Sequence, residues 1–195
     1  LLFTLGTSII SSCGLALWNF NFPVLLELII LAILVNGWVV ERPNIGYLIG
    51  FFLFLIFACR PSGSLFVLAV FSYLFLENKQ QLVKAAVISA VLLILLIVYS
   101  ITTYGSLLPG LYSSGTLLFD SEVPKRFLGH LISPSRGILI YSPIFFMTIV
   151  GCIATGRRCV KNYLFSIIGV WTIVHFVLLS AWPMWWGGGS FGYRI

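Results

Sequence analysis

The chain has 195 residues, of which 60% are hydrophobic and only 8% charged, and its formal net charge is +6. Soluble domains carry roughly 25% charged residues. The composition therefore excludes a soluble globular domain, a disordered chain and a nucleic-acid-binding module. The basic residues are spread along the chain, as in membrane proteins whose Lys and Arg residues set the topology. We expect an all-α, polytopic membrane protein.

Apolar runs recur along the whole sequence. A membrane-spanning helix needs about 20 predominantly apolar residues. The first run has no initiator Met or basic segment before it, and the last residues form a loop, so we expect one transmembrane region that belongs to a longer protein. The runs predict a helix bundle with about seven spans, at about 1–18, 23–40, 45–59, 62–76, 83–103, 137–155 and 163–181.

The third and fourth runs are short, and Arg60-Pro61-Ser62-Gly63 separates them. Pro and Gly favour a turn, and Arg is poorly tolerated in hydrocarbon. One broken helix over residues 45–76 would be about 48 Å long, whereas the hydrocarbon core is about 30 Å thick. We therefore favour a tight hairpin of two short helices.

The positions of Lys and Arg predict the orientation. If the spans alternate, one set of short loops carries Arg42, Lys79, Lys84, Arg157, Arg158 and Lys161. The opposite set carries Arg60, Lys125, Arg126, Arg136 and Arg194. Charge is denser in the first set, which places it in the cytoplasm and the long loop and C-terminal tail outside. The outer cations either anchor lipid headgroups or form an anion site.

The long outer loop, residues 104–136, contains a segment with helical periodicity. At about 100° per residue, its apolar side chains fill one half-turn, and Lys125, Arg126 and His130 fall on the other. Ser121 can cap the N-terminus, and Glu122 and Pro124 suit the first turn. The pattern predicts an interfacial amphipathic helix at about 122–132. It either anchors the loop or frames the entrance for a phosphorylated lipid.

Two further segments could approach a phosphate. Ser133-Pro134-Ser135-Arg136-Gly137 supplies a guanidinium, which binds phosphate through paired hydrogen bonds. Residues 182–194 place Trp residues at a membrane boundary and then a Gly-rich loop, which permits close backbone approach. The candidate substrate-binding residues are Arg136, Arg194, Arg60, Lys125, Arg126, His130, Ser133, Ser190 and Trp186.

Glu27 and His175 are ionisable residues well inside predicted spans. Such groups are functional candidates by default because their burial in lipid is unfavourable. Glu27 either has a function or reaches the interface. His175 either has a function or is a neutral imidazole bonded to a neighbouring helix.

Three segments together resemble bacterial polytopic glycosyltransferases of the GT-C type, a group related to protein mannosyltransferases and aminoarabinose transferases. The segments are the Arg60-Pro61-Ser62 break, SPSRGILIYSP at 133–143 and WWGGGSFGYR at 185–194, and the resemblance covers roughly residues 19–195. Gly189 and Tyr193 depart from the pattern, where an aromatic residue and Pro are common. The resemblance implies transfer of a sugar from a polyprenyl-phosphate donor to a glycan, lipid or protein acceptor at the outer face of the bacterial inner membrane.

Such a reaction needs fixed cations and a base. Cations stabilise the charge that develops on the lipid-phosphate leaving group, and a carboxylate deprotonates the acceptor. In the resembled group that carboxylate lies in the first outer loop, upstream of this sequence, so no catalytic residue is assigned. Asp120 is the remaining candidate, because helix capping explains Glu122. No cofactor is expected, since no carboxylate cluster suits a divalent metal.

Two alternative functions stay open. A transporter or flippase of a lipid-linked or small anionic substrate would use the outer cations together with His175 and Glu27. Transporters often contain internal repeats, and the sequence shows no convincing one. A polymerase or ligase of lipid-linked glycans would have a similar composition.

Overall fold

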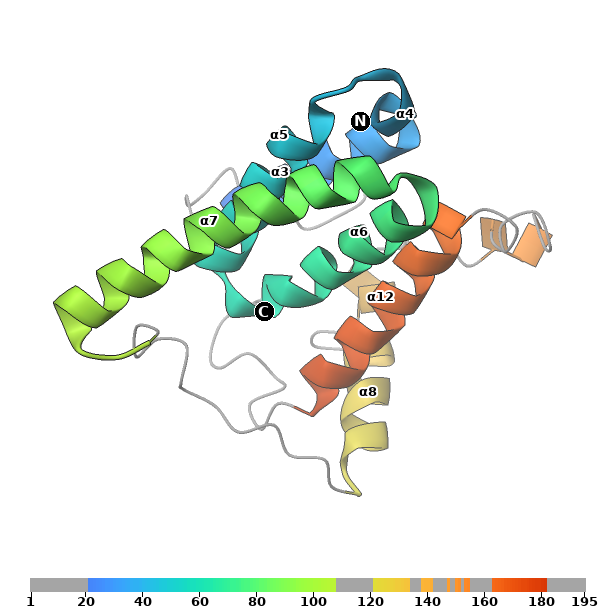
Figure 1. Ribbon diagram of the computed structural model, residues 1–195. Coiled ribbons are helices and arrows are strands. Elements are labelled where there is room, and N and C mark those ends of the chain that lie inside the picture. The colour runs from blue at the N-terminus through green and yellow to red at the C-terminus, as the bar shows by residue number, and fades with distance from the viewer. Residues whose placement is uncertain are drawn as a thin grey trace. The chain divides into compact units, whose positions relative to one another are not determined.

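The computed structural model in Figure 1 is helical. It describes residues 21–107, 121–133, 138–141, 147, 150, 151, 153, 154 and 163–181, and no strand is found among them. These residues belong to two compact units. The N-terminal unit contains residues 21–107, and the C-terminal unit contains the described residues from 121 onward.

The N-terminal unit is a succession of helices with short connections. Gly37 (φ 71°) follows the first helix and Gly105 (φ 66°) follows the last, in the left-handed conformation that commonly ends helices. The elements are α3 (Asn21–Val35), α4 (Trp38–Glu41), α5 (Ile45–Cys59), the 3-10 turn η1 (Pro61–Gly63), α6 (Ser64–Glu77) and α7 (Lys79–Tyr104).

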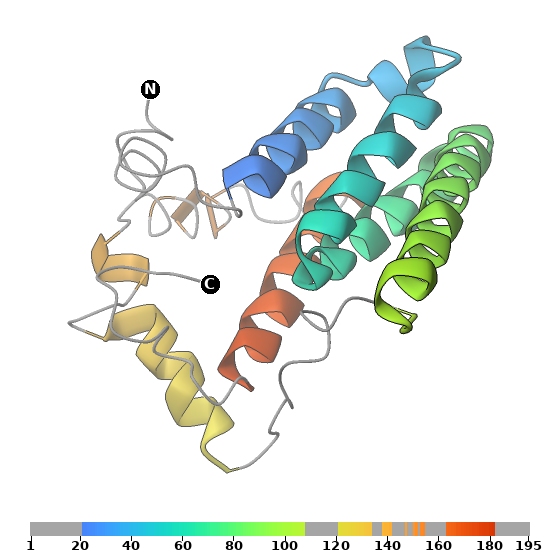
Figure 2. The same cartoon turned by 90° about the vertical axis from the view of Figure 1, so that its left-hand side faces the viewer.

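The predicted hairpin is present between α5 and α6, and a single broken helix is not. Arg60 is extended (φ −149°), and Pro61 begins η1. Gly63 fits closely against α5, because a Cβ there would lie 2.5 Å from the Ile56 Cγ2 atom. Asn78, just after α6, donates to the carbonyl of Val39 (3.4 Å) in α4, the short helix that precedes α5, so α5 and α6 run antiparallel (Figure 2).

The core of the N-terminal unit follows helical periodicity. Apolar residues three and four positions apart line one face of each helix and pack inward. This core includes Leu26, Ile30, Ile33 and Leu34 of α3, Ile49, Leu53 and Ile56 of α5, and Phe66, Val70 and Leu74 of α6.

In the C-terminal unit, α8 packs on α12. The bounds are α8 (Val123–Ile132), α9 (Ile138–Tyr141) and α12 (Tyr163–Ser180). The Phe127 and Phe176 rings meet edge to face, with their centroids 6.4 Å apart. Pro124 lies in the first turn of α8, where its missing N–H is not needed.

Two helices among the described residues are long and apolar enough to cross a membrane, α7 (26 residues) and α12 (18 residues), by length and composition alone. The predicted number of about seven is therefore not met there. The helices α3, α5 and α6 have 15, 15 and 14 residues, below the usual length of about 17–25. The left-handed turn at Gly37 ends α3 inside the predicted run 23–40, whereas the runs 45–59 and 62–76 are already short in the sequence. The predicted span 1–18, and most of 137–155, lie outside the described residues.

Candidate functional site

The side of α8 that is buried differs from the apolar side that its sequence predicts to be buried. His130, expected on the outer basic face, is only 1% exposed, whereas the apolar Leu128 and Ile132 are 55% and 58% exposed. The side that meets α12 is the boundary between the two predicted faces, where Phe127 contacts Phe176. Pro124, Leu128 and Ile132, which are spaced one turn apart, therefore form an exposed apolar stripe along α8.

Lys125 and Arg126 occupy adjacent positions on α8 but different environments. The Lys125 Nζ atom lies 3.3 Å from Glu122 Oε2, and the lysine side chain is 80% exposed. An exposed pair of this kind contributes at most about 1 kcal/mol, so the ammonium can exchange its partner for another anion. Arg126 is half-buried. Ser133 ends the helix, where its N–H donates to the Gly129 carbonyl (3.1 Å).

The environment of His130 favours the neutral imidazole. Burial lowers the pKa of His130 from its ordinary value, and a hydrogen bond with the Leu179 backbone opposes this shift only in part. Leu179 belongs to α12, so the imidazole joins the two helices. The ionisable residues one helical turn away are Arg126, which precedes His130 on α8, and His175, which precedes Leu179 on α12.

The contact between α8 and α12 is expected to weaken at acidic pH. The folded-state pKa of His130 lies below its value of about 6.5 in an unfolded chain. Its contribution is therefore fully present above about pH 6.5 and is lost as the pH falls from that value through the lower folded-state pKa. Hydrogen exchange of the α8 amides, corrected for the intrinsic rate, should accelerate between pH 7.5 and 5.5. His130→Asn, which does not titrate, should abolish this acceleration, and an unchanged acceleration would contradict the assignment.

Arg60 and Glu27 both belong to the N-terminal unit. Arg60 is half-buried at the hairpin turn, and this burial lowers the pKa of its guanidinium. Glu27 is half-buried and flanks the stripe of Leu26 and Ile30 in α3. In the C-terminal unit, the His175 ring lies 6.0 Å from the Trp171 ring, one turn away on α12.

Other predicted residues lie outside the part of the chain that the structure describes. They are Asp120, Arg136, Trp186, Ser190 and Arg194. The structure thus brings Lys125, Arg126, His130 and Ser133 together on α8 and at its end. Among the described residues, no group of three His, Cys, Asp or Glu side chains could hold a metal ion.

A buried polar cluster in the N-terminal unit was not predicted. The Gln81 side chain, 3% exposed, accepts from the Gly46 N–H (2.9 Å) and donates to the Arg42 (2.9 Å) and Pro43 (3.3 Å) carbonyls. Lys84 also donates to the Pro43 carbonyl. The Asn78 side chain caps α7 by accepting from the Gln81 N–H (3.2 Å). The spacing of Gly46 and Gly50, which is typical of close helix contacts, was the available signal.

Comparisons of this chain with protein-family models, with curated proteins and with solved structures find no match.

Proposed function

We propose that this protein is a membrane glycosyltransferase that transfers a sugar from a polyprenyl-phosphate donor to a glycan, lipid or protein acceptor outside the bacterial plasma membrane. The observation that carries the proposal is the arrangement of α8. Its exposed Lys125 adjoins an exposed apolar stripe, and the helix packs on α12, one of the two candidate membrane spans among the described residues.

This arrangement suits the boundary between acyl chains and headgroups. Leu128 and Ile132 are exposed one turn apart, and an interfacial helix buries such a stripe about 5–10 Å below the headgroup boundary. Lys125 immediately follows Pro124, the first exposed residue of that stripe, so its flexible stem can carry the ammonium to a phosphate. A polyprenyl phosphate matches both features, because its prenyl chain is apolar and its phosphate is anionic.

In this proposal α7 of the N-terminal unit and α12 of the C-terminal unit each cross the bilayer. In the most apolar continuous stretch of 18 residues, only 6% of the residues of α7 and 11% of those of α12 are buried, which is low for a core helix of a soluble protein. The shorter α3, α5 and α6 pack with one another and with α7 inside the N-terminal unit. Arg42, Lys79 and Lys84 face the cytoplasm, and α8 faces outside.

The proposed chemistry is the departure of a lipid phosphate. Negative charge grows on the phosphate as its bond to the sugar breaks, and fixed cations lower the energy of that state. Lys125 and Arg126 hold the donor at the membrane surface. Arg136 and Arg194, in the segments that resemble GT-C enzymes, contact the phosphate directly. The acceptor base is not assigned.

Loss of the α8 cations is expected to weaken use of the donor. In membranes that contain the protein and a radiolabelled polyprenyl-phosphate sugar, Lys125→Gln with Arg126→Gln should raise the KM for the donor by about tenfold, the effect of one lost charged contact. The matched control is Lys161→Gln, a cation of the predicted cytoplasmic set, which should leave KM unchanged.

The same assay separates the alternatives. Arg136→Ala and Arg194→Ala should each lower sugar transfer while membrane insertion persists. Normal transfer in both variants would contradict the phosphate-binding role. Movement of the intact labelled lipid between leaflets without any transfer would instead indicate a flippase.

A further inference from the structure

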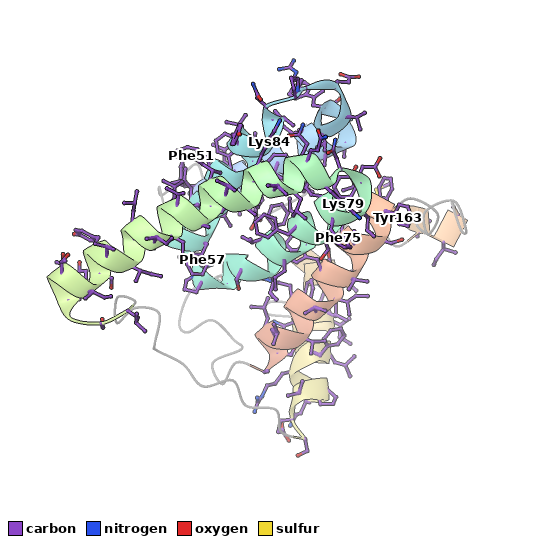
Figure 3. All side chains as sticks on the ribbon, viewed as in Figure 1. Phe51, Phe57, Phe75, Lys79, Lys84 and Tyr163 are labelled. Atoms are coloured by element: carbon purple, nitrogen blue, oxygen red, sulfur yellow. The ribbon has the colours of Figure 1, made fainter. Side chains whose placement is uncertain are left out.

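Three cations lie at one end of the N-terminal unit, each over an aromatic ring. The Arg42 guanidinium lies 4.5 Å from the centroid of the Trp38 ring. The ammonium groups of Lys79 and Lys84 lie 5.4 Å and 5.8 Å from the rings of Phe75 and Tyr47, respectively. Lys79 and Phe75 are drawn side by side in Figure 3. Contacts of this kind hold a cation near an apolar surface while its outer side stays accessible.

Backbone and side-chain hydrogen bonds fix the two cation-bearing segments together. The loop that contains Arg42 is joined to the start of α7 by Gln81, which binds the Arg42 and Pro43 carbonyls, and by Lys84, which binds Pro43. The three cations are therefore parts of one surface, although Arg42 is far from Lys79 in the sequence. We call Arg42, Lys79 and Lys84, with their rings, the cation–aromatic rim.

The rim has charge available for an external anion. Among the described residues, none of its three cations forms an ion pair with an acidic side chain. Glu41 and Glu77 are exposed at the same end, so the rim keeps an excess of positive charge. Arg42 and Lys79 are themselves exposed.

An exposed apolar stripe on α7 begins at the level of the rim. Its first residue, Val83, lies between Lys79 and Lys84, and the stripe then follows one side of the helix for about 22 Å at 1.5 Å per residue. This length approaches the thickness of a hydrocarbon core. The stripe consists of Val83, Val87, Val91, Ile94 and Val98, all exposed. When lipid acyl chains cover this stripe, the headgroups of the same lipids lie beside the rim.

From this continuity and charge we infer that the cation–aromatic rim binds the phosphates of anionic phospholipids in the leaflet on its side of the membrane. Aromatic rings at the headgroup level are typical of membrane boundaries, and Lys and Arg near an anionic leaflet are each attracted to it. The inference requires that α7 crosses a membrane, but it does not depend on sugar transfer.

The test is a lipid titration of the purified protein in a neutral detergent. Phosphatidylglycerol should raise the thermal unfolding midpoint at lower concentrations than phosphatidylcholine does, because a ligand that binds only the folded state stabilises it. In Arg42→Gln with Lys79→Gln, the apparent affinity for phosphatidylglycerol should fall by about tenfold or more. In the part of the chain that the structure describes, neither side chain forms a hydrogen bond or an ion pair, and each has only an exposed ring contact, so the midpoint without lipid should change little.

Glu77→Gln is the matched control. It removes an exposed acid at the same end and should tighten phosphatidylglycerol binding, and added salt should weaken binding in every form. Equal effects of the two lipids on the wild type would overturn the inference. An undiminished phosphatidylglycerol effect in the variant Arg42→Gln with Lys79→Gln would also overturn the inference. Stabilisation by an acidic peptide but not by phosphatidylglycerol would assign the rim to a protein partner and would also overturn it.

Discussion

Gly50→Leu is expected to destabilise the N-terminal unit by about 3 kcal/mol, at the upper end of the usual cost of overpacking. A Cβ at Gly50 would lie 2.2 Å from Ile88 Cγ2, 2.3 Å from the Ala85 carbonyl oxygen and 2.8 Å from the Ala85 Cα. Two of these atoms are backbone atoms that cannot move without displacing α7. Thermal unfolding in detergent, followed by far-ultraviolet circular dichroism, measures the loss.

Gly169→Leu provides the matched comparison. Gly169 also lies within an apolar helix, α12, but nothing is found within 4 Å of a Cβ built there. Leucine has a higher helix propensity than glycine, so this variant should unfold at the same temperature as the wild type or slightly above it. If the two variants lost equal stability, the close approach of α5 and α7 would be refuted.

The expected effect of Gly50→Leu reflects how α5 and α7 pack. Gly46 lies against Gln81, and four residues later in each helix Gly50 lies against Ala85. The helices α5 and α7 therefore run parallel. Small residues four positions apart allow the two backbones to come close. Ser89 then reaches across and donates to the Gly50 carbonyl (2.8 Å). Polar groups thereby hold together two helices whose other faces are apolar.

Much of the local structure could be predicted because local signals determine it. Arg60 and Pro61 indicate the hairpin, and Pro124 and the periodicity after it indicate α8 within one residue of its observed bounds. The number of membrane spans was predicted less well. Hydropathy shows that residues 23–40 are mostly apolar, but it does not show that the left-handed conformation of Gly37 ends the helix there.

The part of the candidate site that could not be predicted depends on tertiary contacts. Periodicity separates polar from apolar positions on α8, but it cannot tell which edge Phe176 and Leu179 will cover. That contact turns His130 inward and leaves Leu128 exposed. Gln81 was missed for a similar reason, since its partners lie 35 to 39 residues earlier in the chain.

Gln81→Leu is expected to destabilise the N-terminal unit by about 2 kcal/mol or more. Leucine resembles glutamine in size, but it would leave the Gly46 N–H and the Arg42 carbonyl without the partner that now binds each at 2.9 Å. Each buried polar group left unsatisfied costs about 1–3 kcal/mol. Gly46 is the second residue of α5, where no earlier helical carbonyl can replace Gln81. The midpoint of thermal unfolding measures the change.

Gln80→Leu separates this role from a general effect of apolar substitution. Gln80 precedes Gln81 on α7 and is exposed, and only its backbone N–H bonds to Asn78, so its replacement should change stability by less than about 0.5 kcal/mol. Loss of Gln81 should also release the Arg42 loop from α7 and weaken phosphatidylglycerol binding, because the rim would no longer be one surface. Equal unfolding temperatures for the two leucine variants would show that Gln81 does not hold α5 and α7 together.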